Sequence, residues 1–183
     1  AVSPSLADMA HSVEVLLDDD SDASIRREWG VLAEAGLPSQ LQVKSTTNRP
    51  HVTLLAADHI NVDVDRLLAE LRDRFPVPCV VGAPLVFGRG RLTLARLIVP
   101  SAQLLALHQE VYRRCLPYVS AEPFAHSAPG HWTPQATLGR RFTAEQVGEA
   151  LGVLDGVSHD LDARVVGLRR WDGDQRVDEV LIS

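Results

Sequence analysis

Two short segments of this chain resemble one another, and they lie about half a chain length apart. The first, PHVTL, occupies residues 50–54, and the second, PQATL, occupies residues 134–138. An offset of 84 residues aligns Thr53 with Thr137. A repeat at this spacing in a chain of 183 residues predicts two similar halves, each of which contributes one copy of the segment.

The elements predicted around the two segments follow the same order in each half: helix, strand, helix, strand, strand, with a further strand at the start of the chain. Alternating apolar residues predict strands, and apolar residues three or four positions apart predict helices. Capping residues and glycines mark the ends of the helices. We expect strands at 12–18, 50–57, 78–88, 91–100, 135–141, 159–171 and 176–183, and helices at 19–36, 62–75, 101–116 and 143–154.

The composition is that of an ordinary soluble globular protein, with 45% hydrophobic residues. A net charge of −6 excludes a surface that coats long duplex nucleic acid, because such binding depends on many basic residues. A small nucleotide or an RNA end stays possible, since a few arginines suffice for it. Cys79 and Cys115 are not in a CxxC spacing and are expected to be reduced, which favours a cytoplasmic protein. The sequence predicts no membrane-spanning segment.

The first repeated segment carries residues suited to phosphate chemistry. Alternate residues of a strand face the same side, so His51 and Thr53 are expected to project together. A histidine transfers protons near neutral pH, and a threonine hydroxyl hydrogen-bonds an anionic oxygen. In the second segment Gln135 stands where His51 stands in the first. A glutamine hydrogen-bonds a phosphate but is not a general acid or base near pH 7.

A second histidine, His131, lies close to the second segment and offers an alternative to Gln135. In a continuous strand it shares a face with Gln135 and Thr137. Four residues of strand nevertheless span about 13 Å, at roughly 3.3 Å each, which is too far for His131 to take the place of residue 135. Pro134 also favours a strand that begins after it. We therefore expect Gln135 to be the equivalent of His51, with His131 at the rim of the site.

With these motifs in a duplicated layout, the chain from about residue 12 to 183 resembles the 2H phosphoesterase superfamily, and in particular the bacterial 2'-5' RNA ligase family. The resemblance implies an α+β, bilobal, duplicated fold in which two antiparallel sheets line a central cleft, with helices outside. Residues 9–183 would form this single domain, with lobes at about 12–90 and 91–183 that exchange strands. Residues 1–8 are expected to be a flexible extension or a remnant left from cloning.

The resemblance also implies a function, which is cyclic phosphodiesterase or 2'-5' RNA ligase chemistry at 2',3'-cyclic phosphates or 2'-5' linkages, without a metal or other cofactor. The partner would be a nucleotide or RNA end, and the protein a monomer that binds neither membranes nor long duplexes. Gln135 favours an alternative, a catalytically impaired module that binds nucleotides or RNA ends. The expected catalytic residues are His51, Thr53, Thr137 and Gln135, and the expected substrate-binding residues are Arg140, His131 and Trp132.

Trp132 has two interpretations that the sequence leaves open. Its aromatic face suits a nucleobase, but packing in the core or at the rim of a lobe is the commoner role of such a residue. A third interpretation of the function, beside the enzyme and the binding module, is a protein that shares only the fold and acts through other surfaces.

The remaining histidines lack the spacing of metal ligands, so no metal site is expected.

Overall fold

A computed structural model describes residues 10–183. The expectation for residues 1–8 concerns a segment outside these described residues. One seven-stranded antiparallel sheet dominates the described chain, with the strand order β2-β1-β6-β3-β4-β5 and with β7 paired to β6. The strands are β1 (His11–Leu17), β2 (His51–Ala57), β3 (Val77–Arg89), β4 (Arg91–Ile98), β5 (Gln135–Phe142), β6 (Leu161–Asp172) and β7 (Val177–Ile182).

The predicted α+β class is confirmed, and the two antiparallel halves of the sheet are joined to each other. The junction is the pairing of β3 with β6 from Val77 to Val81. The two sequence halves also pair with each other on either side of this junction, because β3 pairs with β4 and β1 pairs with β6. The lobe boundaries near residue 90 stay a prediction.

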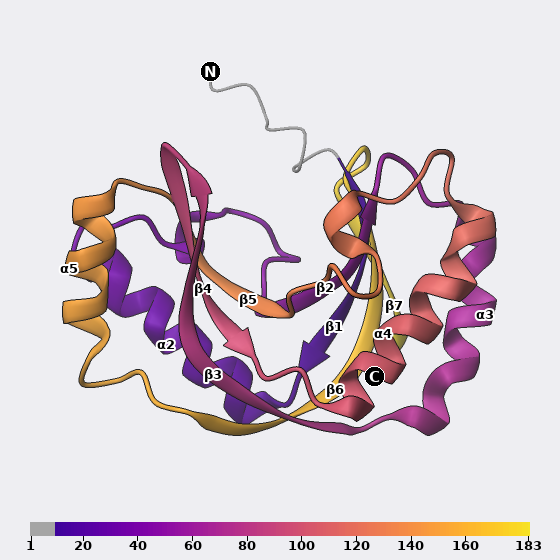
Figure 1. The fold of residues 1–183 in the computed structure, drawn as a ribbon, viewed down its shortest axis with the longest axis horizontal. Coiled ribbons are helices and arrows are strands. Elements are labelled where there is room, and N and C mark those ends of the chain that lie inside the picture. Colours follow the sequence, from indigo (N-terminus) through magenta and orange to yellow (C-terminus); the bar gives the residue numbers. More distant parts are fainter. Residues whose placement is uncertain (1–9) are drawn as a thin grey trace.

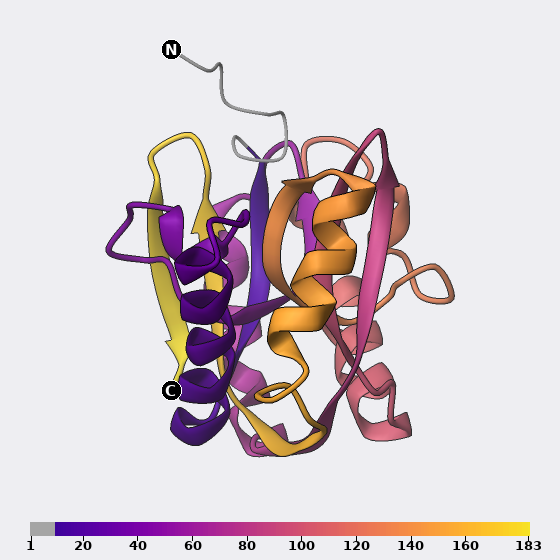
Figure 2. The same ribbon diagram turned by 90° about the vertical axis from the view of Figure 1, so that its left-hand side faces the viewer.

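In residues 10–183, four α-helices cover the outside of the curved sheet in two pairs (Figure 1). The pair α2 (Asp19–Glu34) and α5 (Ala144–Leu154) packs behind β4 and β5, whereas α3 (Asp65–Ala69) and α4 (Ala102–Cys115) lie on the other side of the molecule. The view in Figure 2 shows α2 and α5 side by side. Short 3₁₀ turns occur at Gln40–Gln42, Val62–Val64, Glu70–Arg74, Leu116–Tyr118 and Ala125–Ser127.

The helix starts follow from local capping. The side chain of Asp18 accepts a hydrogen bond from the Ser21 backbone N–H at the start of α2. Thr143 and Gln146 form a capping box at the start of α5. The helix predicted at 62–75 is only partly α-helical, because its first and last turns are 3₁₀. Short helices commonly tighten in this way at their ends, and Pro76 disfavours a helical conformation at the residue before it.

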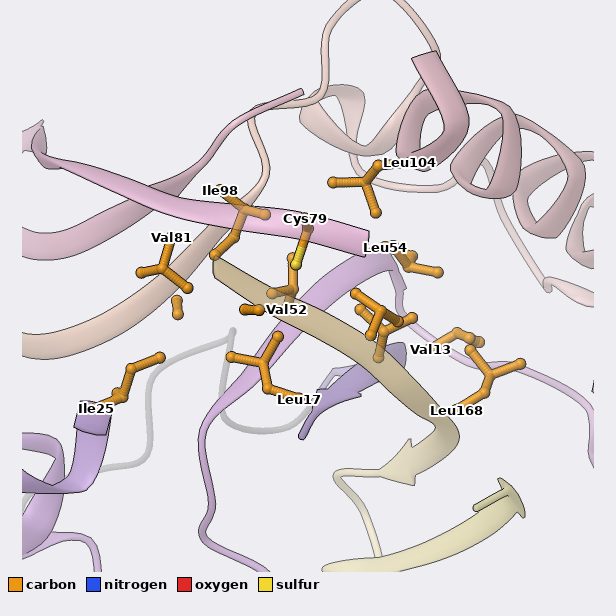
Figure 3. Close-up of a cluster of buried hydrophobic side chains, with 14 of the residues drawn as sticks. Val13, Leu17, Ile25, Val52, Leu54, Cys79, Val81, Ile98, Leu104 and Leu168 are labelled. Carbon is orange, nitrogen blue, oxygen red and sulfur yellow. The ribbon is translucent and has the colours of Figure 1, made fainter. Parts of the chain in front are cut away.

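The core lies between the sheet and the helices. Figure 3 shows part of it, where Val13, Val52 and Leu54 meet Leu104 and Leu168 from distant parts of the chain. Burial of such apolar side chains is the main force that holds the layers together. None of the helices in residues 10–183 is both long enough and apolar enough to cross a membrane.

Candidate functional site

The two strands that carry the repeated segments, β2 and β5, end the hydrogen-bonded path of the sheet at opposite edges. The sheet curls so strongly that Cα atoms of these two strands come within 8 Å of one another. In both strands half-buried and buried residues alternate: His51, Thr53, Gln135 and Thr137 are half-buried, whereas Val52, Leu54, Ala136 and Leu138 are buried. The predicted polar residues therefore face away from the core on two neighbouring strands.

The register of the sheet gives Gln135 the place that His51 has in the first half. His51 pairs with Leu16 of β1, and Gln135 pairs with Leu97 of β4. The strand begins at Gln135, directly after Pro134. His131 is exposed in a turn four residues earlier, outside the strand. His131 therefore does not occupy the position equivalent to His51.

The ring of His51 is oriented by two groups. Its Nδ1 lies 2.8 Å from the carbonyl oxygen of Arg49. A carbonyl only accepts, so Nδ1 carries a proton and Nε2 is the nitrogen that gains or loses one. On the other side, Nε2 lies 3.4 Å from Oε1 of Glu14. That distance is an ion-pair contact, longer than the about 2.7–3.2 Å of an N–H···O hydrogen bond.

Glu14, on β1, is a functional candidate that the sequence analysis missed. Its carboxylate is buried and accepts hydrogen bonds from Arg169 Nε at 2.7 Å and from Ser12 Oγ at 2.9 Å. Burial alone would raise the pKa of Glu14, but the charges of His51 and Arg169 and these hydrogen bonds hold it below its ordinary value. Glu14 is therefore an anion beside the histidine. The sequence feature that could have identified Glu14 is its charge, because it stands among apolar residues in the first predicted strand.

The second half has no equivalent of this pair. Glu14 lies opposite Thr53 in the sheet, and the residue opposite Thr137 is Ala95. The Oε1 atom of Gln135 is buried and has no hydrogen-bond partner among the described residues. A buried amide oxygen without a partner is costly, and a donor on a bound ligand would satisfy it. The site thus combines an imidazole and a carboxylate on one edge with an amide on the other.

The backbone carbonyl of each motif threonine accepts a hydrogen bond from a tryptophan indole. Because β2 and β5 are edge strands, carbonyl groups on their outer sides lack strand partners. Trp132 Nε1 donates to the carbonyl oxygen of Thr53 at 2.9 Å, and Trp29 Nε1 donates to that of Thr137 at 3.0 Å. The two indoles come from different elements, the loop before β5 and helix α2. Each fixes the backbone of one threonine.

Trp132 is also packed against a histidine. Its ring stacks on His108, with centroids 3.9 Å apart. His108 is buried, which lowers its pKa, although contacts to the carbonyls of Ser127 and Leu54 oppose that shift. One face of the indole is therefore covered by protein. Its predicted contact with a nucleobase stays a prediction, as does the phosphate contact of Arg140, which is exposed three residues after Thr137.

A close backbone approach positions the end of β5. A Cβ atom at Gly139 would lie 2.7 Å from the carbonyl oxygen of Pro38 and 2.9 Å from the ring of Phe142. Only glycine fits between them without a shift of backbone. The loop after α2 therefore packs directly on β5 next to Arg140.

One group of side chains in residues 10–183 has the composition of a metal site, namely His11, His59 and Asp174. Nδ1 of His11 accepts a hydrogen bond from the Ile60 backbone N–H, so Nε2 carries the proton of the neutral ring. Nε2 accordingly lies 2.8 Å from Oδ2 of Asp174, to which it donates. A histidine that ligates a metal instead donates from its other nitrogen. This hydrogen-bonding pattern does not fit a metal at Nε2 of His11.

Comparison with known proteins adds two findings. A family model described as the 2'-5' RNA ligase superfamily matches residues 21–176. Two solved structures of Kluyveromyces marxianus Usb1, one of them with uridine monophosphate, are similar in fold, with TM-scores of 0.52 and 0.53. Each is 12% identical in sequence, and each comparison covers 98% of this chain and 100% of the solved chain. Among curated proteins, none is significantly similar.

Proposed function

The chain belongs to the 2'-5' RNA ligase superfamily, and from this premise we propose that it is a phosphoesterase that acts on nucleotides or RNA ends. The bonds it acts on are those of 2',3'-cyclic phosphates or 2'-5' phosphodiesters. Acid–base catalysis by its own side chains carries the reaction. The observation that carries this proposal is His51, with its tautomer set by Arg49, on a strand that lies beside a second strand with a matching threonine.

Each site residue has a role that its chemistry allows. Nε2 of His51 exchanges a proton with the substrate, since Nδ1 is held by a carbonyl. The hydroxyl groups of Thr53 and Thr137 donate to phosphoryl oxygens, and so does the amide N–H of Gln135. Such donors stabilise the charge that develops on the phosphoryl group during transfer.

Uridine 2',3'-cyclic phosphate is a suitable first substrate, because one of the similar structures contains uridine monophosphate. We expect the purified protein to hydrolyse it, and we expect His51→Ala to reduce kcat by about 10²–10⁴-fold through loss of the proton-transfer group. The rate is measured by separating the cyclic and the opened nucleotide. His126→Ala changes an exposed histidine outside the two motif strands, and as the control it should retain activity.

Absence of turnover with cyclic nucleotides and with 2'-5' linked dinucleotides alike would overturn the enzymatic proposal. A second candidate function is then a binding module for nucleotides or RNA ends, and Gln135 is the observation that favours it. In that case uridine monophosphate binds to the wild-type protein, as measured by calorimetry, and Thr53→Val weakens its binding. Failure of both turnover and binding would leave a protein that shares only the fold.

A further inference from the structure

We propose that Phe87, on β3, stacks on a nucleobase of the substrate, and that β3 and β4 form the base-binding wall of the site. This inference rests on the proposed function and deepens it, because it names the part of the substrate that this wall binds. The substrate is then held at two points, with its phosphoryl group at Thr53 and Thr137 and a base on the ring of Phe87.

The register of the sheet places Phe87 on the same face as Thr137. Thr137 of β5 lies opposite Ala95 of β4, and Ala95 lies opposite Leu85 of β3. Residues directly opposite in neighbouring strands point to one face, and so do residues two positions apart in one strand. Phe87 is two residues after Leu85, and this part of the pairing between β3 and β4 has no register shift. The ring of Phe87 therefore projects from the face that carries Thr137.

Phe87 is exposed, and it belongs to a group of apolar side chains beside the polar site. Its exposed fraction is 42%. Leu85 and Leu97 are half-buried and share its face, the latter because it lies opposite Gln135. Single apolar residues at a surface are common, but a group of them that borders convergent polar side chains is typical of a ligand-binding site.

The wall formed by β1 and β6 has a different chemistry. Glu14 lies opposite both Thr53 and Arg169 in the sheet, so charged side chains share the face of the first motif strand. On the wall formed by β3 and β4, the side chains that share the face of Thr137 below the hairpin tip are uncharged: Leu85, Phe87, Thr93, Ala95 and Leu97. A neutral wall with an aromatic ring suits the flat face of a base, and stacking of this kind is tolerant of base identity.

The tip of the same hairpin adds positive charge next to the ring. Arg89 and Arg91 are exposed, and each lies two residues from the pair formed by Phe87 and Thr93. Figure 1 shows this hairpin rising on the side of the molecule away from β1 and β7. In a chain with a net charge of −6, two arginines at one tip favour the phosphates of an RNA strand that continues past the ring.

The spacing of the strands brings the ring within reach of a bound substrate. Two strand spacings of roughly 4.8 Å and two residues of roughly 3.3 Å place the backbone of Phe87 about 12 Å from that of Thr137. In a 2',3'-cyclic phosphate the glycosidic nitrogen is four bonds from phosphorus, or up to about 6 Å at roughly 1.5 Å per bond, and the base extends beyond it. The base of the nucleotide that carries the phosphate, or the next base of an RNA chain, can therefore lie on Phe87.

The test measures ligand binding to Phe87→Ala in the whole chain by calorimetry, with Val86→Ala as the matched control. Val86 is 40% exposed, as Phe87 nearly is, but it points to the other face of β3. The three probes are uridine 2'-phosphate, a uridine dinucleotide that ends in a 2'-phosphate, and inorganic phosphate, which has no base. Phe87→Ala should weaken binding of a nucleotide probe by about 5–150-fold, the effect of losing one stacked base, and should leave phosphate binding unchanged. Val86→Ala and Phe87→Tyr, which keeps a ring, should bind all three probes as the wild type does.

The two nucleotide probes distinguish which base is bound. A loss with the mononucleotide places the base of the phosphate-bearing nucleotide on Phe87, and a loss confined to the dinucleotide places the neighbouring base there. Equal affinity of wild type and folded Phe87→Ala for both nucleotides would overturn the inference and leave the proposed function intact. Weaker phosphate binding in Phe87→Ala would overturn it too, because the change would then act on the phosphate site. A wild-type protein that binds none of the probes would count against the inference and the proposed function together.

Discussion

The two edge strands of the sheet share their backbone arrangement but differ in their chemistry. Both present a threonine two residues after the start of the strand, and in both a tryptophan indole donates to the carbonyl of that threonine. Only the first strand has a histidine, and only the strand beside it has a carboxylate. Under the proposed function, holding a phosphoryl group uses both halves and transferring a proton uses one, so we expect mutations to separate the two tasks.

Restoring a histidine to the second half should have the largest effect. Gln135→His adds a proton-transfer group opposite His51, and such a group contributes about 10²–10⁴-fold to a rate. We expect kcat for uridine 2',3'-cyclic phosphate to rise by a factor in this range, because the new imidazole can exchange a proton with water or substrate.

Steady-state rates would measure this change, with Gln135→Asn as a control that keeps an amide. An unchanged rate in the histidine variant would mean that residue 135 does not face the reacting atoms. The matched positions of the two halves would then be equivalent in the sheet without being equivalent in the site.

A second comparison concerns the buried ion pairs near the two motif strands, each of which joins one sequence half to the other. Next to the second motif strand, NH1 of Arg96 on β4 lies 2.9 Å from both carboxylate oxygens of Glu28 on α2. This pair lies on the core side, because Arg96 is opposite the buried Ala136. In the pair of Glu14 on β1 and Arg169 on β6, Glu14 instead lies 3.4 Å from His51. We infer that the pair of Arg96 and Glu28 stabilises the fold and that the pair of Glu14 and Arg169 serves the site.

Glu28→Gln tests this difference. Removing one partner leaves an uncompensated buried guanidinium, which typically lowers the free energy of unfolding by about 3–5 kcal/mol. Urea unfolding followed by circular dichroism measures the loss, and the exposed Glu145→Gln should cost little. Below the unfolding transition, kcat and KM should stay as in the wild type. A lower kcat/KM in folded Glu28→Gln protein would show that this pair also serves the site.

Local patterns predicted most of the fold, but long-range contacts in the site were not predicted. The alternation of polar and apolar residues gave the orientation of His51 and Thr53, and Pro134 gave the start of β5. The link between Glu14 and Arg169 joins residues that are 155 positions apart, and it depends on β1 pairing with β6. No local pattern indicates which strands become neighbours, so the carboxylate beside the histidine was not expected.

The smallest expected effect concerns the feature that the two halves share. Trp132→Phe and Trp29→Phe each keep a ring but remove the N–H that holds a threonine carbonyl, and a hydrogen bond of this kind contributes about 0.5–1.5 kcal/mol. If both threonines bind the phosphoryl group, each change should lower kcat/KM by up to about tenfold. Trp29 is 1% exposed, so its smaller replacement should also reduce stability, whereas the stacked and less buried Trp132 should lose less. The two variants are compared at a temperature where both are folded. Equal losses of kcat/KM would support equal roles for the two edge strands. A loss confined to Trp132→Phe would assign substrate binding to β2, the strand that contains His51.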